Sequence, residues 1–105
     1  MTTPHAVCDA LGDPTRREIL DRLRRGPTSV GALADALPVS RPAVSQHLKV
    51  LTTAGLVGHR QDGTRHVYHL DPAGLEPMRA WLDGFWQDAL DSFAQFARTN
   101  AETGL

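Results

Sequence analysis

Apolar residues recur at intervals of three and four along much of the chain, which is the spacing that places them on one face of an α-helix. Asp13 before Pro14, and Ser40 with Pro42 in the following turn, are typical helix starts, because the first side chain caps the helix and a proline loses no hydrogen bond there. Gly55 is a typical helix end. The pattern predicts four helices, over residues 4–11, 14–25, 30–37 and 40–54.

The spacing changes after the fourth predicted helix. Residues 56–60 and 65–70 have the short, partly alternating pattern of β-strands and flank Asp62-Gly63, a dipeptide that favours a tight turn. The sequence therefore predicts a two-stranded hairpin. With Asp62-Gly63 as its loop, His59 and His66 would lie directly opposite one another.

A long helix is predicted over residues 75–98, after Asp71-Pro72, and residues 99–105 are expected to form a flexible tail. Its apolar stripe is too broad for a helix that lies alone on a protein surface. The stripe consists of Leu75, Met78, Leu82, Phe85, Ala89, Phe93 and Phe96, widened by Trp81, Trp86 and Leu90.

The predicted order is four helices, a hairpin and a last helix, with only about three residues between the third and fourth helices. This is a mainly α fold with a small β-hairpin (α+β), and the order is that of a winged helix-turn-helix. At 105 residues the chain has room for one such domain, with a core over about residues 5–98. In this fold the helix after the tight turn enters the DNA major groove.

Four segments resemble the ArsR (SmtB-like) family of bacterial transcriptional repressors: Asp13–Leu20, Ser29–Ala34, Ser40–Leu51 and Ala54–Val57. The resemblance extends over about residues 5–98. It implies a homodimer built from the first and last helices, in which each protomer offers one recognition helix and one wing to an inverted-repeat operator in double-stranded DNA. The predicted interface residues are Val7, Leu11, Leu82, Phe85, Ala89, Phe93 and Phe96.

The recognition helix is predicted to turn Val44, Leu48 and Leu51 inward, which leaves a polar face without a carboxylate. Gln46 can pair with the N6 and N7 atoms of adenine, and we expect it to read a base. The candidate DNA contacts on this helix are Ser40, Arg41, Ser45, Gln46 and Lys49.

The hairpin offers a second set of candidate DNA contacts, Arg60, Thr64 and Arg65. An arginine at a narrow hairpin tip can enter a minor groove, where negative potential is concentrated. Arg65 is the better placed of the two arginines for that role.

The net charge of −1 would argue against a nucleic-acid partner, but the charges are unevenly distributed. Residues 14–27 and 40–70 are basic, whereas residues 71–105 are acidic. The second predicted helix is expected to turn four arginines outward: Arg16, Arg17, Arg24 and Arg25. A contact between at least one of them and the DNA backbone is left open as an alternative. The distribution favours one surface that faces an anion and a different role for the last helix.

The single cysteine, Cys8, excludes a disulfide within the chain, and no apolar run approaches the ~20 residues that would span a membrane. The first residues lack the pattern of a signal peptide. We expect a cytoplasmic protein without a membrane partner or a cofactor.

The metal sites of related sensors are missing from the sequence. Residues 30–35 hold no Cys-x-Cys pair, and no histidine follows His69. Two unfamiliar pairs, His5 with Cys8 and His59 with His66, leave a metal- or thiol-responsive repressor open as an alternative. The main prediction is a repressor without a recognisable metal site. Such a repressor would be either constitutive or regulated by an unknown small molecule.

Two other function classes are weaker. An enzyme would need a nucleophile and a positioned base in a cleft, whereas Ser45 and His47 point to different faces of one helix, so no catalytic residue is predicted. A winged-helix module that binds only proteins would be expected to lose the polar face and the basic wing, and this sequence keeps both.

Overall fold

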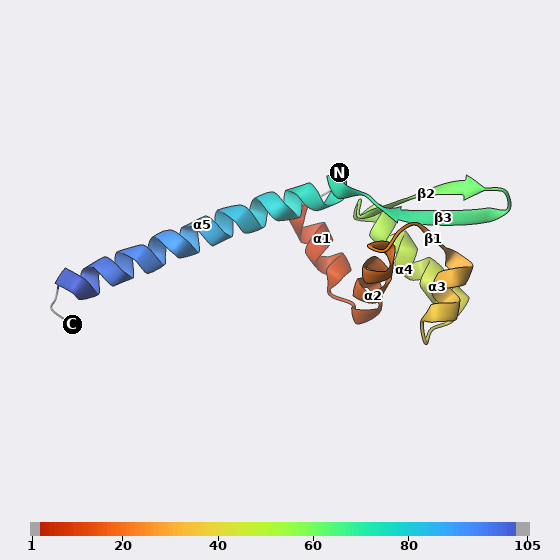
Figure 1. Cartoon of the computed structure of the whole chain (residues 1–105), viewed down its shortest axis with the longest axis horizontal. Coiled ribbons are helices and arrows are strands. Elements are labelled where there is room, and N and C mark those ends of the chain that lie inside the picture. Colours follow the sequence, from red (N-terminus) through yellow and green to blue (C-terminus); the bar gives the residue numbers. More distant parts are fainter. Residues whose placement is uncertain (1–2, 103–105) are drawn as a thin grey trace.

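Residues 3–102 are described by a computed structural model, in which five helices accompany a three-stranded antiparallel sheet (Figure 1). The elements are α1 (Pro4–Leu11), α2 (Pro14–Leu23), β1 (Thr28–Ser29), α3 (Val30–Ala36), α4 (Arg41–Thr53), β2 (Val57–Asp62), β3 (Arg65–Leu70) and α5 (Pro72–Glu102). This confirms the predicted fold class and element order. The tight turn between α3 and α4 is present as predicted.

The two predicted N-cap residues, Asp13 and Ser40, cap α2 and α4. The Asp13 carboxylate accepts the backbone N–H groups of Thr15 at 2.8 Å and Arg16 at 3.1 Å, and the Ser40 hydroxyl accepts that of Ala43 at 3.2 Å. These groups are among the first N–H groups of each helix, which have no partner within the helix. The start of α4 is therefore determined by local chemistry.

One face of α4 packs in the hydrophobic core. Val44, Leu48 and Leu51 are completely buried there, and burying one such side chain contributes about 1.5–3 kcal/mol. They pack in one cluster with side chains from α2, α3 and the link between α4 and β2, chiefly Ile19, Leu33 and Leu56. Because one side of α4 is held this way, its opposite side faces solvent.

Helix α5 leaves the rest of the molecule after its first turns (Figure 1). Met78 still packs against the core, but residues 79–99 are all exposed. The molecule is consequently elongated, with extents of 69 × 28 × 21 Å. The helix continues to Glu102, beyond the predicted end at Arg98, and residues 103–105 of the predicted tail lie outside the described residues.

A close backbone contact sets the direction of α5. Gly74 lies in the first turn of α5 directly against Gly55, and a Cβ atom at Gly74 would overlap the Gly55 carbonyl group. Gly55 itself has φ +81°, in the left-handed region that favours glycine. The backbone N–H of Asp71 donates to the Leu56 carbonyl at 2.9 Å beside this contact. The end of α4 and the start of α5 are thus joined without intervening side chains.

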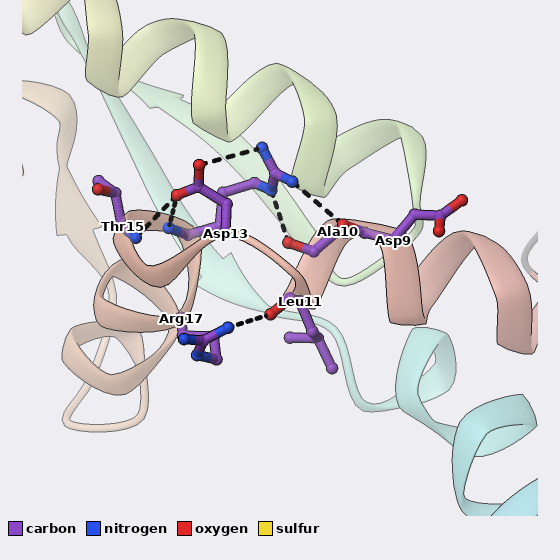
Figure 2. Close-up of polar contacts among 7 residues, drawn as sticks. Asp9, Ala10, Leu11, Asp13, Thr15 and Arg17 are labelled. Carbon is purple, nitrogen blue, oxygen red and sulfur yellow. Dashed lines mark hydrogen bonds and ion pairs between the residues drawn. The ribbon is translucent and has the colours of Figure 1, made fainter.

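Two arginines that were expected to point outward cap the end of α1, and one of them, Arg17, is exposed as predicted (Figure 2). Arg16 donates through Nε to the Ala10 carbonyl and through Nη2 to the Asp9 carbonyl, at 2.5 and 3.1 Å, and Arg17 donates to the Leu11 carbonyl at 2.7 Å. The last carbonyls of a helix lack partners and carry partial negative charge, which attracts guanidinium groups. The Arg16 side chain is only 18% exposed, so the outward prediction is wrong for this residue.

The hairpin differs from its prediction in its turn. Asp62 pairs with Arg65, so the loop is Gly63-Thr64 rather than Asp62-Gly63. Gly63 has φ +65°, and a glycine at the first loop position is what a type II′ turn requires. The register shifts accordingly, and His59 lies opposite Tyr68 instead of His66.

A short third strand was not predicted. In β1, Thr28 pairs with Tyr68 and Ser29 with Val67, so β3 is the central strand of the sheet. A strand of two residues has no period that the sequence could reveal. It ties the start of α3 to the hairpin.

We predict that Gly74→Ala lowers the free energy of unfolding by about 3 kcal/mol, the upper end of the usual cost of overpacking. The new methyl group has no room beside the Gly55 carbonyl. Gly84→Ala is the matched control, since a Cβ there meets nothing within 4 Å. Gly84→Ala should raise the free energy of unfolding by about 0.5–1 kcal/mol, because a glycine inside a helix is less favourable than an alanine. Urea unfolding followed by circular dichroism measures both, and equal stability of the two variants would contradict the close contact.

The pKa of Asp13 lies below its ordinary value of 3.8, chiefly because the carboxylate accepts the backbone N–H of Arg16. Burial opposes this shift, while the N–H of Thr15 and the charges of His47 and Arg16 add to it. A carboxylate with a lowered native pKa stabilises the fold above its unfolded pKa, and this contribution is lost as the pH falls through the native pKa. Wild type should therefore melt above Asp13→Asn at pH 7, and the difference should shrink below about pH 4. A difference in melting temperature that is independent of pH would contradict the assignment.

Candidate nucleic-acid interface

The outer face of α4 presents all five polar residues that the sequence nominated. The five are Ser40, Arg41, Ser45, Gln46 and Lys49, and each of them is exposed. Val44 and Leu48, which lie between them in the sequence, are buried. Gln46 and Lys49 are three positions apart and share one side of the helix. The arrangement gives α4 a polar surface without a carboxylate, which an anionic ligand can approach.

The wing places Arg60, Thr64 and Arg65 in solvent. Thr64 is the second loop residue and Arg65 the first residue of β3, so both lie at the hairpin tip. Asp62 is paired with Arg65 across the strands, but no ion pair within 4.0 Å joins them. The guanidinium of Arg65 is therefore available to an external anion.

A cavity of about 610 Å³ lies between α4 and the wing tip. Four of the nominated residues line it, namely Arg41 and Ser45 from α4 and Thr64 and Arg65 from the wing. Ser40, Gln46, Lys49 and Arg60 lie outside it. The two separately predicted sets of contacts thus meet on one concave surface, with Gln46 and Lys49 on the adjoining face of α4.

The same cavity includes residues that sequence reasoning missed. They come from the end of β1, the start of α3 and the wing: Ser29, Val30, Gly31, Ala32, Asp35 and His66. The pairing of β1 with β3 brings them there. A Cβ atom on Gly31 would lie 3.7 Å from Nη2 of Arg41, so this guanidinium lies over the first turn of α3.

The basic groups of this surface form no ion pair with any other residue in the range 3–102. Among residues 3–102, the ion pairs within 4.0 Å involve Arg16, Arg24 and Arg79, and none involves the arginines and the lysine of the candidate surface. Asp35 is the one carboxylate among the described residues that line the cavity, which Arg41 and Arg65 also line. The surface is therefore positive overall, and its donors are free for a ligand.

The predicted dimer surface divides into two parts. Phe85, Phe93 and Phe96 are each more than 60% exposed, and Leu82 is 46% exposed, so α5 offers a continuous apolar stripe with Ala89 between them. Val7, in contrast, is completely buried in the core and Leu11 is half-buried against it. Val7 is a core residue of the protomer because α1 turns that side toward the cluster, and its predicted contact with a partner is corrected.

The two candidate pairs of metal ligands, His5 with Cys8 and His59 with His66, are not joined by further histidine, cysteine or carboxylate ligands among the described residues. His59 lies against Tyr68 with ring centroids 5.1 Å apart, and His66 is a diagonal neighbour at 5.8 Å. Within residues 3–102 no three histidine, cysteine or carboxylate side chains come together as metal ligands. In the same range, no helix is both long enough and apolar enough to span a bilayer.

Comparison with known proteins places this surface in a family. A family described as a helix-turn-helix domain matches residues 11–60, which include α2, α3 and α4. The chain is 59% identical over 93 residues to the HTH-type transcriptional regulator Rv2034 of Mycobacterium tuberculosis, covering 89% of this chain and 87% of that protein. It is 34% identical to the transcriptional repressor SdpR of Bacillus subtilis, covering 75% and 88%.

Solved structures agree with these relatives. The ArsR-like transcriptional regulator from Rhodococcus sp. RHA1 is 36% identical and superposes with a TM-score of 0.74, over 90% of this chain and 92% of that chain. The chain belongs to the ArsR family of transcriptional regulators. The family resemblance inferred from the sequence motifs is thereby confirmed. So is the prediction of a DNA-binding regulator rather than an enzyme.

Proposed function

We propose that this ArsR-family protein is a homodimeric repressor that binds an inverted-repeat operator in double-stranded DNA. The observation that supports the proposal is the shared cavity, because Arg41 and Ser45 of α4 line it together with Thr64 and Arg65 of the wing tip. A recognition helix in the major groove and a wing at the neighbouring groove need such a common surface.

The outer face of α4 reads the bases in this proposal. Gln46 can donate to N7 and accept from N6 of adenine, an arrangement that no other base pair offers in the same way. Ser45 can bond to several bases, and Lys49 suits a phosphate or a guanine. Ser40 lies at the N-terminus of α4, where backbone N–H groups attract a phosphate.

The wing holds the adjoining part of the duplex. If α4 lies in the major groove, the sugar-phosphate strand beside it runs between α4 and the wing, past Arg41 and Thr64. Arg65 then reaches the minor groove, where a narrow groove concentrates negative potential. Arg60 lies further along β2 and supports the backbone contact.

Dimerisation through α1 and α5 accounts for the exposed stripe. A contiguous apolar surface of this kind is uncommon on a monomer and is typical of an interface. Leu82, Phe85, Ala89, Phe93 and Phe96 form the proposed contact on α5. The half-buried Leu11 is the proposed contact from α1. Two copies joined in this way present two recognition helices, as an inverted repeat requires.

Regulation in this proposal does not depend on zinc or arsenic. The cysteine and histidine ligands of the corresponding family sites are absent from the sequence, and a small-molecule effector remains the proposed alternative to constitutive repression. A DNA partner also implies a cytoplasmic location.

The direct test is a gel shift with purified protein and its own upstream DNA over a salt series, with Zn²⁺ or a chelator added in parallel. We expect specific binding that weakens steeply with salt and ignores Zn²⁺. Binding that Zn²⁺ abolishes would overturn the zinc-independent part. Failure to bind either this DNA or a library of random duplexes specifically would favour a protein-interaction module.

We predict distinct effects of two substitutions on operator binding. Gln46→Ala should cost about 1–3 kcal/mol and relax specificity at one operator position. Arg65→Ala should weaken binding to all sequences and reduce the slope of log K against log salt by about 1. Arg98→Ala removes the same charge from α5 and serves as the control, with unchanged binding. Fluorescence anisotropy measures these constants, and wild-type affinity in both interface variants would contradict the assigned surface.

We predict that Phe93→Glu yields monomers, because an unpaired charge is strongly unfavourable in an apolar interface. Gln95→Glu adds the same charge two positions later, about 200° around the helix, and should leave the dimer intact. Analytical ultracentrifugation distinguishes the two masses. A dimer that survives Phe93→Glu would place the interface elsewhere.

A further inference from the structure

A small groove lies between α2 and the turn that joins α3 to α4. Its volume is about 290 Å³, and it shares no lining residue with the cavity between α4 and the wing. Its walls are largely apolar, and two charged side chains of α2 complete them: Pro14, Ala36, Leu37 and Pro38, with Glu18 and Arg22. Sites for drug-sized ligands measure roughly 300–1,000 Å³, so this groove suits a smaller molecule.

The guanidinium of Arg22 is poorly satisfied in this groove. Its Nε atom is buried and has no hydrogen-bond partner among residues 3–102, which is unfavourable for a charged donor. Nη2 donates to the Ala36 carbonyl at 3.5 Å, beyond the ~2.7–3.2 Å of an ordinary N–H···O bond. A carboxylate commonly accepts two parallel hydrogen bonds from one guanidinium, and Nε and Nη2 together form an edge suited to it.

Glu18 lies one turn before Arg22 on the same side of α2. A glutamate and an arginine at this i, i+4 spacing commonly form an ion pair. Within the described range 3–102, however, no ion pair within 4.0 Å involves either residue. Glu18 is exposed and Arg22 is half-buried. The groove therefore holds an acidic and a basic group, one helical turn apart, and neither has a charged partner in this part of the chain.

We propose that this groove binds a free α-amino acid with an apolar side chain. The carboxylate of the ligand accepts hydrogen bonds from Nε and Nη2 of Arg22, and its ammonium group donates to the Glu18 carboxylate. An α-amino acid carries both charges on one carbon atom, which suits two side chains on successive turns of one helix. The side chain of the ligand packs on the apolar wall formed by Leu37 and Pro38.

The two charges of the groove select this class of ligand. A simple carboxylate would meet the like charge of Glu18, and a simple amine would meet that of Arg22, so each of them is disfavoured. Because Nε is covered in the free protein, the Arg22 side chain must turn outward on binding. It gives up only the long contact with the Ala36 carbonyl.

The position of the groove connects it to α4. Leu37 and Pro38 belong to the turn that leads to Ser40, the N-cap of α4. A ligand in the groove therefore contacts the segment that positions this helix. The binding step itself is independent of the proposed function, because the groove and the candidate DNA cavity share no lining residue.

The test is isothermal titration calorimetry of the full-length protein, without DNA, with L-leucine as the probe. Two analogues each lack one charged group: 4-methylpentanoate has no ammonium and 3-methylbutylamine has no carboxylate. We expect one leucine per chain and binding of either analogue that is weaker by about tenfold or more, as the loss of a hydrogen bond between charged groups implies. Equal binding of leucine and either analogue would overturn the proposal, as would the absence of leucine binding at millimolar concentration.

Variants of the two charged residues test the assignment. Glu18→Gln and Arg22→Gln should each lower the leucine affinity by about tenfold or more, for the same reason. Arg25→Gln is the matched control, because Arg25 is an exposed arginine just after α2 that does not line the groove, and its affinity should equal that of wild type. Glu18→Gln changes an exposed residue and remains informative if Arg22→Gln disturbs the fold. Wild-type leucine affinity in a folded Glu18→Gln variant would overturn the proposal.

Discussion

The backbone contact between Gly74 and Gly55 is the constraint on which the layout of this regulator depends. It joins the end of the recognition helix to the beginning of the long helix with no side chain between them, so neither helix can tilt freely against the other. The direction in which α5 leaves the core determines where its aromatic stripe lies. In the proposed dimer, that direction also sets the separation of the two recognition helices, and with it the spacing of the operator half-sites.

A second constraint concerns charge. The basic segment around residues 14–27 gives the sequence much of its local positive charge, yet Arg16 and Arg17 are engaged by the carbonyl groups at the end of α1. They hold the corner between α1 and α2 (Figure 2) rather than facing a partner. The positive surface therefore depends on a few side chains of α4 and the wing, for which no ion pair within the described part of the chain competes.

The two ends of the molecule have separate chemistry. Helix α5 and the hairpin extend toward opposite ends of the molecule (Figure 1). Polar and basic groups line the cavity between α4 and the hairpin, whereas α5 exposes aromatic rings. The α1–α5 junction lies between these ends.

The sequence by itself determined the helices, their caps, the recognition face and the family, because these depend on neighbours within a few residues. Asp13, Ser40 and the spacing of Val44, Leu48 and Leu51 act locally and behave as expected. The tertiary structure decided what depends on distant partners: the strand β1, the Gly63-Thr64 turn, the burial of Val7 and the inward Arg16. No local pattern encodes such contacts, since packing between remote segments selects one arrangement among several that each segment allows by itself.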